Sequence, residues 1–215
     1  MRREVGLAVT LVLAGCASQV TPSSLTETPM TTPPSASEAM DVRVLGAAGE
    51  ELEPGRYTRD DFDPRVTFEV GEGWTAEQVA DGLFDVQQDV GSPHVIAVQF
   101  ARPLGPATAL EIANRLAADQ ALAVSEPERV TVGGLDAIRL VIETTDPIET
   151  QPPMFREVLT VPAGPISIAS GRRLQVTLID IPDGVLAILV GGSIANWPIT
   201  LDVAMPVVDS VTIGD

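Results

Sequence analysis

Two pairs of apolar stretches, each joined by a two-residue turn, constrain this chain more than any other feature of its sequence. Residues 129–132 and 135–143 flank Gly133-Gly134, and residues 174–181 and 185–190 flank Asp183-Gly184. Such dipeptides between stretches of this kind are typical of tight β-hairpins. The sequence therefore predicts an antiparallel sheet in the second half of the chain.

Further strands and one clear helix are predicted from hydrophobic periodicity. The strands are 66–70, 82–88, 94–100 and 155–161, with an extended tail at 210–213. Thr108 and Glu111 form a capping-box pattern that opens a helix from Ala109 to about Leu122. The apolar stripe of this helix consists of Ala109, Ile112, Ala113, Leu116 and Ala117.

A second, shorter amphipathic helix is predicted over 199–209, capped by Asn196 or Thr200. Ile199, Val203 and Val207 fall on one face of it. Two helices and about seven antiparallel strands predict the α+β class, an antiparallel sheet flanked by two main helices. We expect a single acidic globular domain of this class to span residues 42–215.

The N-terminus has the pattern of a signal peptide with a lipid-attachment site. Arg2 and Arg3 precede an apolar stretch at 5–14, which is too short to span a membrane. Leu13-Ala14-Gly15-Cys16 resembles the bacterial lipobox, which implies cleavage between Gly15 and Cys16 and attachment of palmitate-type acyl chains to Cys16. The alternative is an ordinary secretory signal beside an unrelated cysteine, but Cys16 is the only cysteine in the chain.

The sequence after Cys16 predicts a disordered tether over 16–41. Fourteen of the twenty residues from Ser18 to Ser37 are Ser, Thr or Pro, and such a segment cannot bury enough apolar surface to fold. With residues 1–15 removed as a signal peptide, the expected product is a lipoprotein on the extracytoplasmic (outer) face of the cell membrane. Its first partner would be the lipid bilayer, reached through acylated Cys16.

Charge excludes one class of partner. The formal net charge is −17, and loss of Arg2, Arg3 and Glu4 with the signal peptide would bring it to −18. All thirteen basic residues are arginine. A chain of this charge repels nucleic acid, so we predict no nucleic-acid partner.

The residue types needed for common catalytic sites are scarce, so we predict that the protein is not an enzyme. The absence of lysine excludes Schiff-base and Ser–Lys chemistry, and His94 is the only histidine. His94 is interpreted as a partly exposed residue at a strand end. A carboxylate-based hydrolase is the least favoured function, because only 4% of the chain is aromatic and a sugar platform needs aromatic side chains. No cofactor and no metal site are predicted.

Three weaker features carry alternative interpretations. Asp60-Asp61-Phe62-Asp63 offers oxygen ligands for Ca²⁺, but a solvated acidic turn is favoured. Asp85 and Asp89 are predicted to share the solvent face of strand 82–88. Trp74 and Trp197 could line a ligand pocket, and Trp74 is the candidate binding residue, although core or rim packing is the default interpretation for it.

Short motifs resemble known families. Leu52-Glu53-Pro54-Gly55-Arg56-Tyr57, followed by Phe62, Pro64, Phe68 and Trp74, resembles the opening of uncharacterised actinobacterial-type lipoproteins. More weakly, 66–74, Gly134-Leu135-Asp136-Ala137 and Val208-Asp209-Ser210-Val211 resemble PsbP-like and LpqN-like domains, with Gly71 where that pattern usually has Pro. This second resemblance implies a PsbP-like sandwich and an accessory or binding role.

Two functional classes follow from the sequence. The first is a membrane-anchored binding or accessory module that presents a face or pocket to an envelope protein, a lipid or a small ligand. The second is a passive structural envelope lipoprotein without a ligand pocket. An apolar pocket of several hundred Å³ lined by Trp74 or its neighbours would favour the first class.

Overall fold

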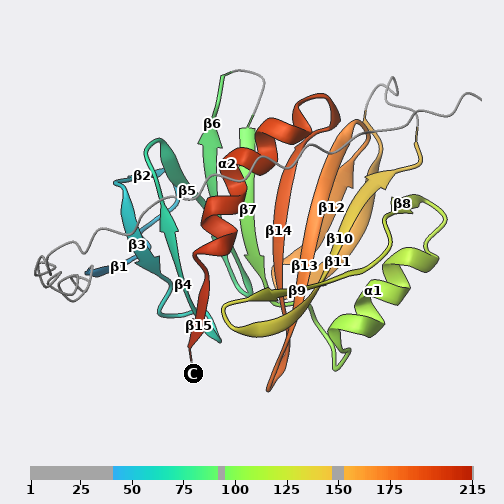
Figure 1. Cartoon of the computed structure of the whole chain (residues 1–215), viewed down its shortest axis with the longest axis horizontal. Helices are drawn as coiled ribbons and strands as arrows, with labels where there is room; N and C mark the ends of the chain where they lie inside the picture. The colour runs from blue at the N-terminus through green and yellow to red at the C-terminus, as the bar shows by residue number, and fades with distance from the viewer. Residues whose placement is uncertain (1–40, 92–94, 147–152, 215) are drawn as a thin grey trace, which may run out of the picture. The chain divides into compact units, whose positions relative to one another are not determined.

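The predicted antiparallel sheet lies at the centre of the fold. A computed structural model describes residues 41–91, 95–146 and 153–214, all within the unit Ala39–Asp215 (Figure 1). The large sheet contains, in order, β2 (Glu50–Leu52), β5 (Trp74–Ala80), β6 (Leu83–Asp89), β7 (Val95–Ala101), β14 (Gly184–Ser193), β13 (Arg172–Ile181), β10 (Leu135–Thr144) and β8 (Leu122–Val124). β9 (Glu128–Val132) pairs with β10 next to β8, and all of these pairs are antiparallel. Both predicted hairpins are present. The first turns at Gly133-Gly134 as predicted, with Val132 opposite Leu135. The second turns at Pro182-Asp183, one residue earlier than predicted, so that Gly184 pairs with Ile181.

Two smaller sheets accompany it. The first consists of β1 (Val42–Val44), β3 (Gly55–Thr58), β4 (Arg65–Val70) and β15 (Thr212–Gly214) in that order, with β1 parallel to β3. The second is the hairpin of β11 (Phe155–Val161) and β12 (Gly164–Ala169). A 3-10 turn, η1 (Ile194–Asn196), leads from β14 into the last helix.

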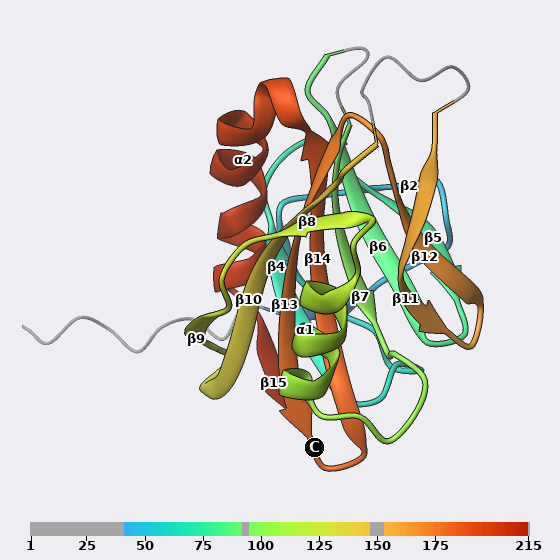
Figure 2. The ribbon, with the colours of Figure 1, turned by 90° about the vertical axis from the view of Figure 1, so that its right-hand side faces the viewer.

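The large sheet is covered on both faces, which explains the continuous apolar runs in its central strands. Along β14, Leu186, Ile188 and Val190 belong to one core, whereas Val185, Ala187 and Leu189 belong to the other. α2 (Trp197–Asp209) and the four-stranded sheet cover the first face, and α1 (Ala109–Ala118) and the β11–β12 hairpin cover the second. Figure 2 shows α2 and the β11–β12 hairpin on opposite sides of the large sheet.

Stacked phenylalanines join the four-stranded sheet to the large sheet. Phe84 stacks on Phe100 with ring centroids 4.6 Å apart, and Phe68 of β4 stacks on Phe100 at 5.2 Å. Phe62 meets Phe84 edge-on at 4.8 Å. Aromatic pairs in these geometries add to the stabilisation that burial provides.

The capping box of α1 is present as predicted, but the predicted end of the helix at Leu122 is wrong. Thr108 Oγ1 accepts from the Glu111 amide, and the Thr108 amide donates to Glu111 Oε2 at 2.8 Å. The helix ends at Ala118, and its C-cap residue Asp119 accepts from the Ala121 amide through its side chain at 2.9 Å. Leu122 then pairs with Thr144 at the sheet edge and is buried there, so its apolar character reflects a strand rather than a further helical turn.

α2 begins at Trp197, and its buried face differs from the predicted one. Asn196 stands at the N-cap position without a side-chain capping bond. Ile199 is 52% exposed, and the helix instead buries Trp197, Thr200, Ala204, Val207 and Val208. Gly192 explains this orientation, because a Cβ there would lie 2.2 Å from Thr200 Oγ1. The glycine lets the helix approach β14 at Thr200 rather than at Ile199.

The predicted α+β class, an antiparallel sheet flanked by two helices, is confirmed. The structure contains more strands than the sequence predicted. Among the strands that were not predicted, β1, β2 and β8 have three residues each, too few for a period to show, whereas β5 has seven and β12 has six. β1 also pairs parallel to β3, and a parallel pair cannot be predicted from a hairpin turn.

Candidate functional site

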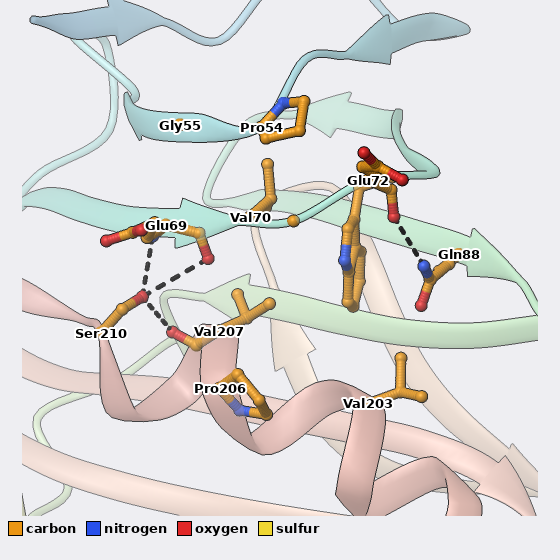
Figure 3. A pocket seen from close by; sticks show the side chains of 12 residues that line it. Pro54, Gly55, Glu69, Val70, Glu72, Gln88, Val203, Pro206, Val207 and Ser210 are labelled. Atoms are coloured by element: carbon orange, nitrogen blue, oxygen red, sulfur yellow. Dashed lines mark hydrogen bonds between the residues drawn. The ribbon is translucent and has the colours of Figure 1, made fainter.

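A cleft lies where the C-terminal half of α2 faces β4 and the turn after it (Figure 3). Its volume is about 740 Å³. Its lining is apolar at Pro54, Val70, Trp74, Val203, Pro206 and Val207, polar at Glu69, Glu72, Gln88 and Ser210, and completed by Gly55 and Gly71. Such a volume falls within the range of ligand sites.

The floor of the cleft is formed by residues of the core between the four-stranded sheet and the large sheet. Val70 continues the inward-facing series of β4, and Val207 is on the buried face of α2. Trp74 begins β5 after the turn at Gly71–Gly73 and is 3% exposed, so only a small part of the side chain reaches the cleft. Val203 is half-buried, and Pro206 is exposed on the helix side.

Two side chains fasten the walls of the cleft. Ser210 Oγ accepts from the Glu69 amide at 2.7 Å and donates to the Val207 carbonyl at 2.7 Å, which ties β4 to the end of α2. Gln88 Nε2 donates to the Glu72 carbonyl at 2.7 Å and holds the turn against β6. Because both walls are fixed by hydrogen bonds to backbone, the cleft is a built feature of the fold.

A second hollow of about 880 Å³ adjoins the cleft. It is lined by Glu51, Leu52, Glu53, Pro54, Glu72, Gly73 and Gln88, and it shares Pro54, Glu72 and Gln88 with the cleft. The two hollows therefore form a continuous groove, and the residues that line them include no arginine.

The rim of this groove is acidic. Glu51, Glu53, Glu69 and Glu72 are all exposed. Glu53 pairs with Arg43 Nη1 at 3.0 Å, and Glu69 lies directly across from Arg56 in the β3–β4 register. Within the described residues, Glu51 and Glu72 form no ion pair with an arginine.

The structure places Trp74, the candidate binding residue, in the lining of the cleft, and its role in ligand binding stays a prediction. Trp197 does not line the cleft. It is buried at the start of α2, where the Arg173 guanidinium lies 5.5 Å from its ring centre. Gly71, which stands where the PsbP-like pattern usually has Pro, also lines the cleft.

The acidic turn at 60–63 is fastened by arginines. Arg59 pairs with Asp61 and lowers the pKa of Asp61 by hydrogen bonding to the carboxylate. Asp60 lies 3.6 Å from Arg65, and Asp63 lies 3.9 Å from Arg102. Over 41–91, 95–146 and 153–214, no group of three or more His, Cys, Asp or Glu residues is arranged to hold a metal ion.

The prediction that Asp85 faces solvent is wrong. The residue is 1% exposed, and Asp85 Oδ2 accepts from Gln87 Nε2 at 3.0 Å and from Gln99 Nε2 at 3.4 Å. Its strand is central in the sheet, and both faces of that sheet are covered. Asp89, at the end of the same strand, is exposed as predicted.

Several predicted sites lie outside the described residues. These are Cys16 and Gly15 of the lipid-attachment motif, the signal peptide, the tether to residue 40, and His94. In the part of the chain that the structure describes, no helix has the length and apolar character to cross a membrane.

Comparison with known proteins shows weak structural similarity and no sequence match. No protein-family model and no curated protein matches the chain. The fold is similar to cyanobacterial PsbP (CyanoP) from Synechocystis sp. PCC 6803, with a TM-score of 0.45 and 12% identity over 79% of this chain and 99% of that one. It is also similar to LpqN of Mycobacterium tuberculosis, a protein involved in cell envelope biogenesis, with a TM-score of 0.44 and 12% identity over 76% of this chain and 93% of that one.

Proposed function

We propose that this protein is a membrane-anchored, extracytoplasmic binding module that holds a ligand or a partner segment in the cleft between α2 and β4. One observation carries the proposal. A cleft of about 740 Å³ has an apolar floor that includes Trp74, and hydrogen bonds of Ser210 and Gln88 to the backbone hold its walls in place. The Cys16 motif and the Ser/Thr/Pro-rich tether in the sequence support the anchored location.

The open space at Gly71 favours binding over a passive structural role. A Cβ at Gly71 would meet nothing within 4 Å, and the backbone there is not left-handed. A larger side chain at this position could therefore close part of the cleft without backbone strain. A passive lipoprotein would gain from covering the apolar surface that Pro54, Val203 and Pro206 expose, since burial of apolar surface is stabilising.

The polar groups of the cleft suit binding better than catalysis. Ser210 is the one hydroxyl among the lining residues, and its bonds to Glu69 and Val207 occupy it structurally. A nucleophilic serine needs an adjacent base, and the lining includes no histidine, lysine or cysteine. We therefore propose a non-enzymatic role.

Site-specific photo-crosslinking in cells tests this function. A photoreactive amino acid replaces Glu72 on the cleft rim of the full-length protein, and the same group at exposed Glu126 serves as the control. After irradiation, mass spectrometry identifies protein, lipid or small-molecule adducts. We expect a discrete adduct at position 72 and none of the same mass at position 126.

A cleft-filling variant makes the result specific. Gly71→Phe should abolish the adduct formed at position 72. Gly214→Phe is the matched control, because a Cβ there meets only the Arg65 carbonyl, at 3.9 Å, and Gly214 does not line the cleft. Equal adducts at positions 72 and 126, or an adduct that survives Gly71→Phe, would contradict the proposal.

A further inference from the structure

We infer that the cleft binds a cationic, partly apolar segment of a partner protein, in which arginine or lysine side chains alternate with apolar ones. This inference rests on the proposed function and adds the chemical class of the ligand. It is carried by the charge of the rim, the polarity of the helix end at the cleft, and the presence of two adjoining hollows.

Among the residues that the structure describes, two carboxylates of the rim form no ion pair with an arginine. The arginine ion pairs of the described residues are Arg43–Glu53, Arg59–Asp61, Arg65–Asp60, Arg102–Asp63, Arg156–Asp146 and Arg173–Glu143. Glu51 and Glu72 belong to no such pair, and both line the second hollow. Arg43 pairs with Glu53, and Arg56 lies opposite Glu69 in the β3–β4 register. Glu51 and Glu72 thus offer two negative charges that a cationic side chain would neutralise.

The end of α2 adds a second source of negative potential. The last turn of the helix supplies Pro206 and Val207 to the cleft, and Ser210 caps it. The C-terminal end of a helix carries partial negative charge, which basic residues commonly offset. α2 has no basic residue in its last turn. A ligand cation near Ser210 would take that role.

The floor accounts for the apolar part of the ligand. Pro54, Val203 and Pro206, which are exposed or half-buried, offer aliphatic surface in the lining of the cleft. Arginine and lysine lay their methylene stems along such surface while their charged ends stay in water. An apolar neighbour in the ligand would contact the same floor.

An extended peptide fits the groove better than a small molecule does. The two hollows adjoin at Glu72, in the turn between β4 and β5, and both are bordered by exposed side chains. Small-ligand sites instead enclose most of the ligand surface. β15 pairs only with Arg65–Thr67 of β4, so the remaining edge of β4 borders the cleft. The Glu69 carbonyl lies on this edge, 3.5 Å from Ser210 Oγ, whose closer acceptor is the Val207 carbonyl at 2.7 Å, and it can accept from a peptide amide.

Calorimetric titration of the full-length protein in detergent with capped peptides tests the inference. One peptide has three Val-Arg repeats, and two others replace Arg by Ser or by Glu. We expect the arginine peptide to bind most tightly. Glu51→Gln/Glu72→Gln should weaken its binding about fivefold, as expected for two partly exposed charge pairs. Glu126→Gln/Asp136→Asn removes the same charge at exposed positions outside both hollows and should change binding less than about twofold.

The other outcomes separate this inference from the function on which it rests. Equal weakening by the two double variants would mean diffuse attraction to an acidic protein and would overturn the inference. If the serine peptide binds as tightly as the arginine peptide and Gly71→Phe blocks both, the cleft is a binding site and only the cationic preference is wrong. If Gly71→Phe leaves binding of the arginine peptide unchanged, the peptide binds elsewhere and the inference fails. The crosslinking result at position 72 then decides the proposed function independently.

Discussion

One residue inside the large sheet, Asp85, shows how a buried polar group is accommodated by hydrogen bonds. Asp85 lies on a covered face, and two glutamine amides from β6 and β7 supply donors to its carboxylate. Buried polar groups are tolerated when they are hydrogen-bonded, and they are costly when a partner is removed. Replacing any one of these three side chains by an apolar one would therefore remove at least one hydrogen bond from the group.

Asp85→Ala should destabilise the protein more than its small change in volume implies. The substitution leaves the amides of Gln87 and Gln99 without this acceptor, and we expect a loss of about 2–3 kcal/mol in the free energy of unfolding. Urea denaturation followed by circular dichroism at pH 7 measures the loss. Asp85→Asn keeps a carbonyl acceptor of the same shape and should cost less. An alanine variant as stable as the asparagine variant would show that these bonds contribute nothing.

At the scale of elements, those whose signals are local could be predicted from the sequence. The capping box of α1 needs only Thr108 and Glu111, and the hairpin at Gly133-Gly134 needs only its turn and flanking strands. The end of α1 and the face of α2 depend on distant residues. Leu122 pairs with Thr144 of β10, and Thr200 packs closely against Gly192 of β14.

The candidate site was predictable only in part, for the same reason. Trp74 could be singled out because a tryptophan after a glycine turn is conspicuous in a chain with few aromatic residues. Val203, Pro206 and Ser210 carry no signal of their own. They line the cleft only because α2 folds back beside β4, and no local pattern in the sequence encodes that approach.

The capping box gives α1 a pH-dependent contribution to stability. Bonds from the Thr108 amide and hydroxyl lower the pKa of Glu111 below its ordinary value of 4.5. Folding thus favours the ionised carboxylate. This contribution is complete above pH 4.5 and is lost as the pH falls through the lowered pKa of the folded state.

Glu111→Gln should therefore lower the stability at pH 7, and the difference from the wild type should shrink as the pH falls below 4.5. Thr108→Ala removes the other half of the box and should cost about 1 kcal/mol at pH 7. Denaturant titrations across the acid range measure both effects. A Glu111→Gln difference that stays constant down to the lowest pH would refute the capping role of the carboxylate.

At the scale of the whole molecule, the acidic charge and the proposed anchor act together. The expected mature charge of −18 disfavours contact with anionic lipid headgroups, so attachment would depend on the acyl chains at Cys16. A tether would then hold the binding cleft clear of the bilayer.

Cys16→Ser should remove the protein from the membrane fraction or leave its signal peptide uncleaved. The cause is the loss of the only thiol that could receive lipid. Fractionation of cells and medium, followed by intact-mass measurement, distinguishes these two results. Ser18→Ala, two residues further along, is the control. An unchanged, processed, membrane-bound Cys16→Ser protein would refute lipid attachment at this residue.

The pairing of β4 with β15 bears on the order in which the chain can fold. β4 ends at Val70, but its partner β15 begins only at Thr212. In the same way, β7 ends at Ala101, and its partner β14 begins at Gly184. If the chain is secreted from its N-terminus as we propose, β4 and β7 would leave the channel before their partners β15 and β14. The two sheets would then be completed only after most of the described residues have emerged.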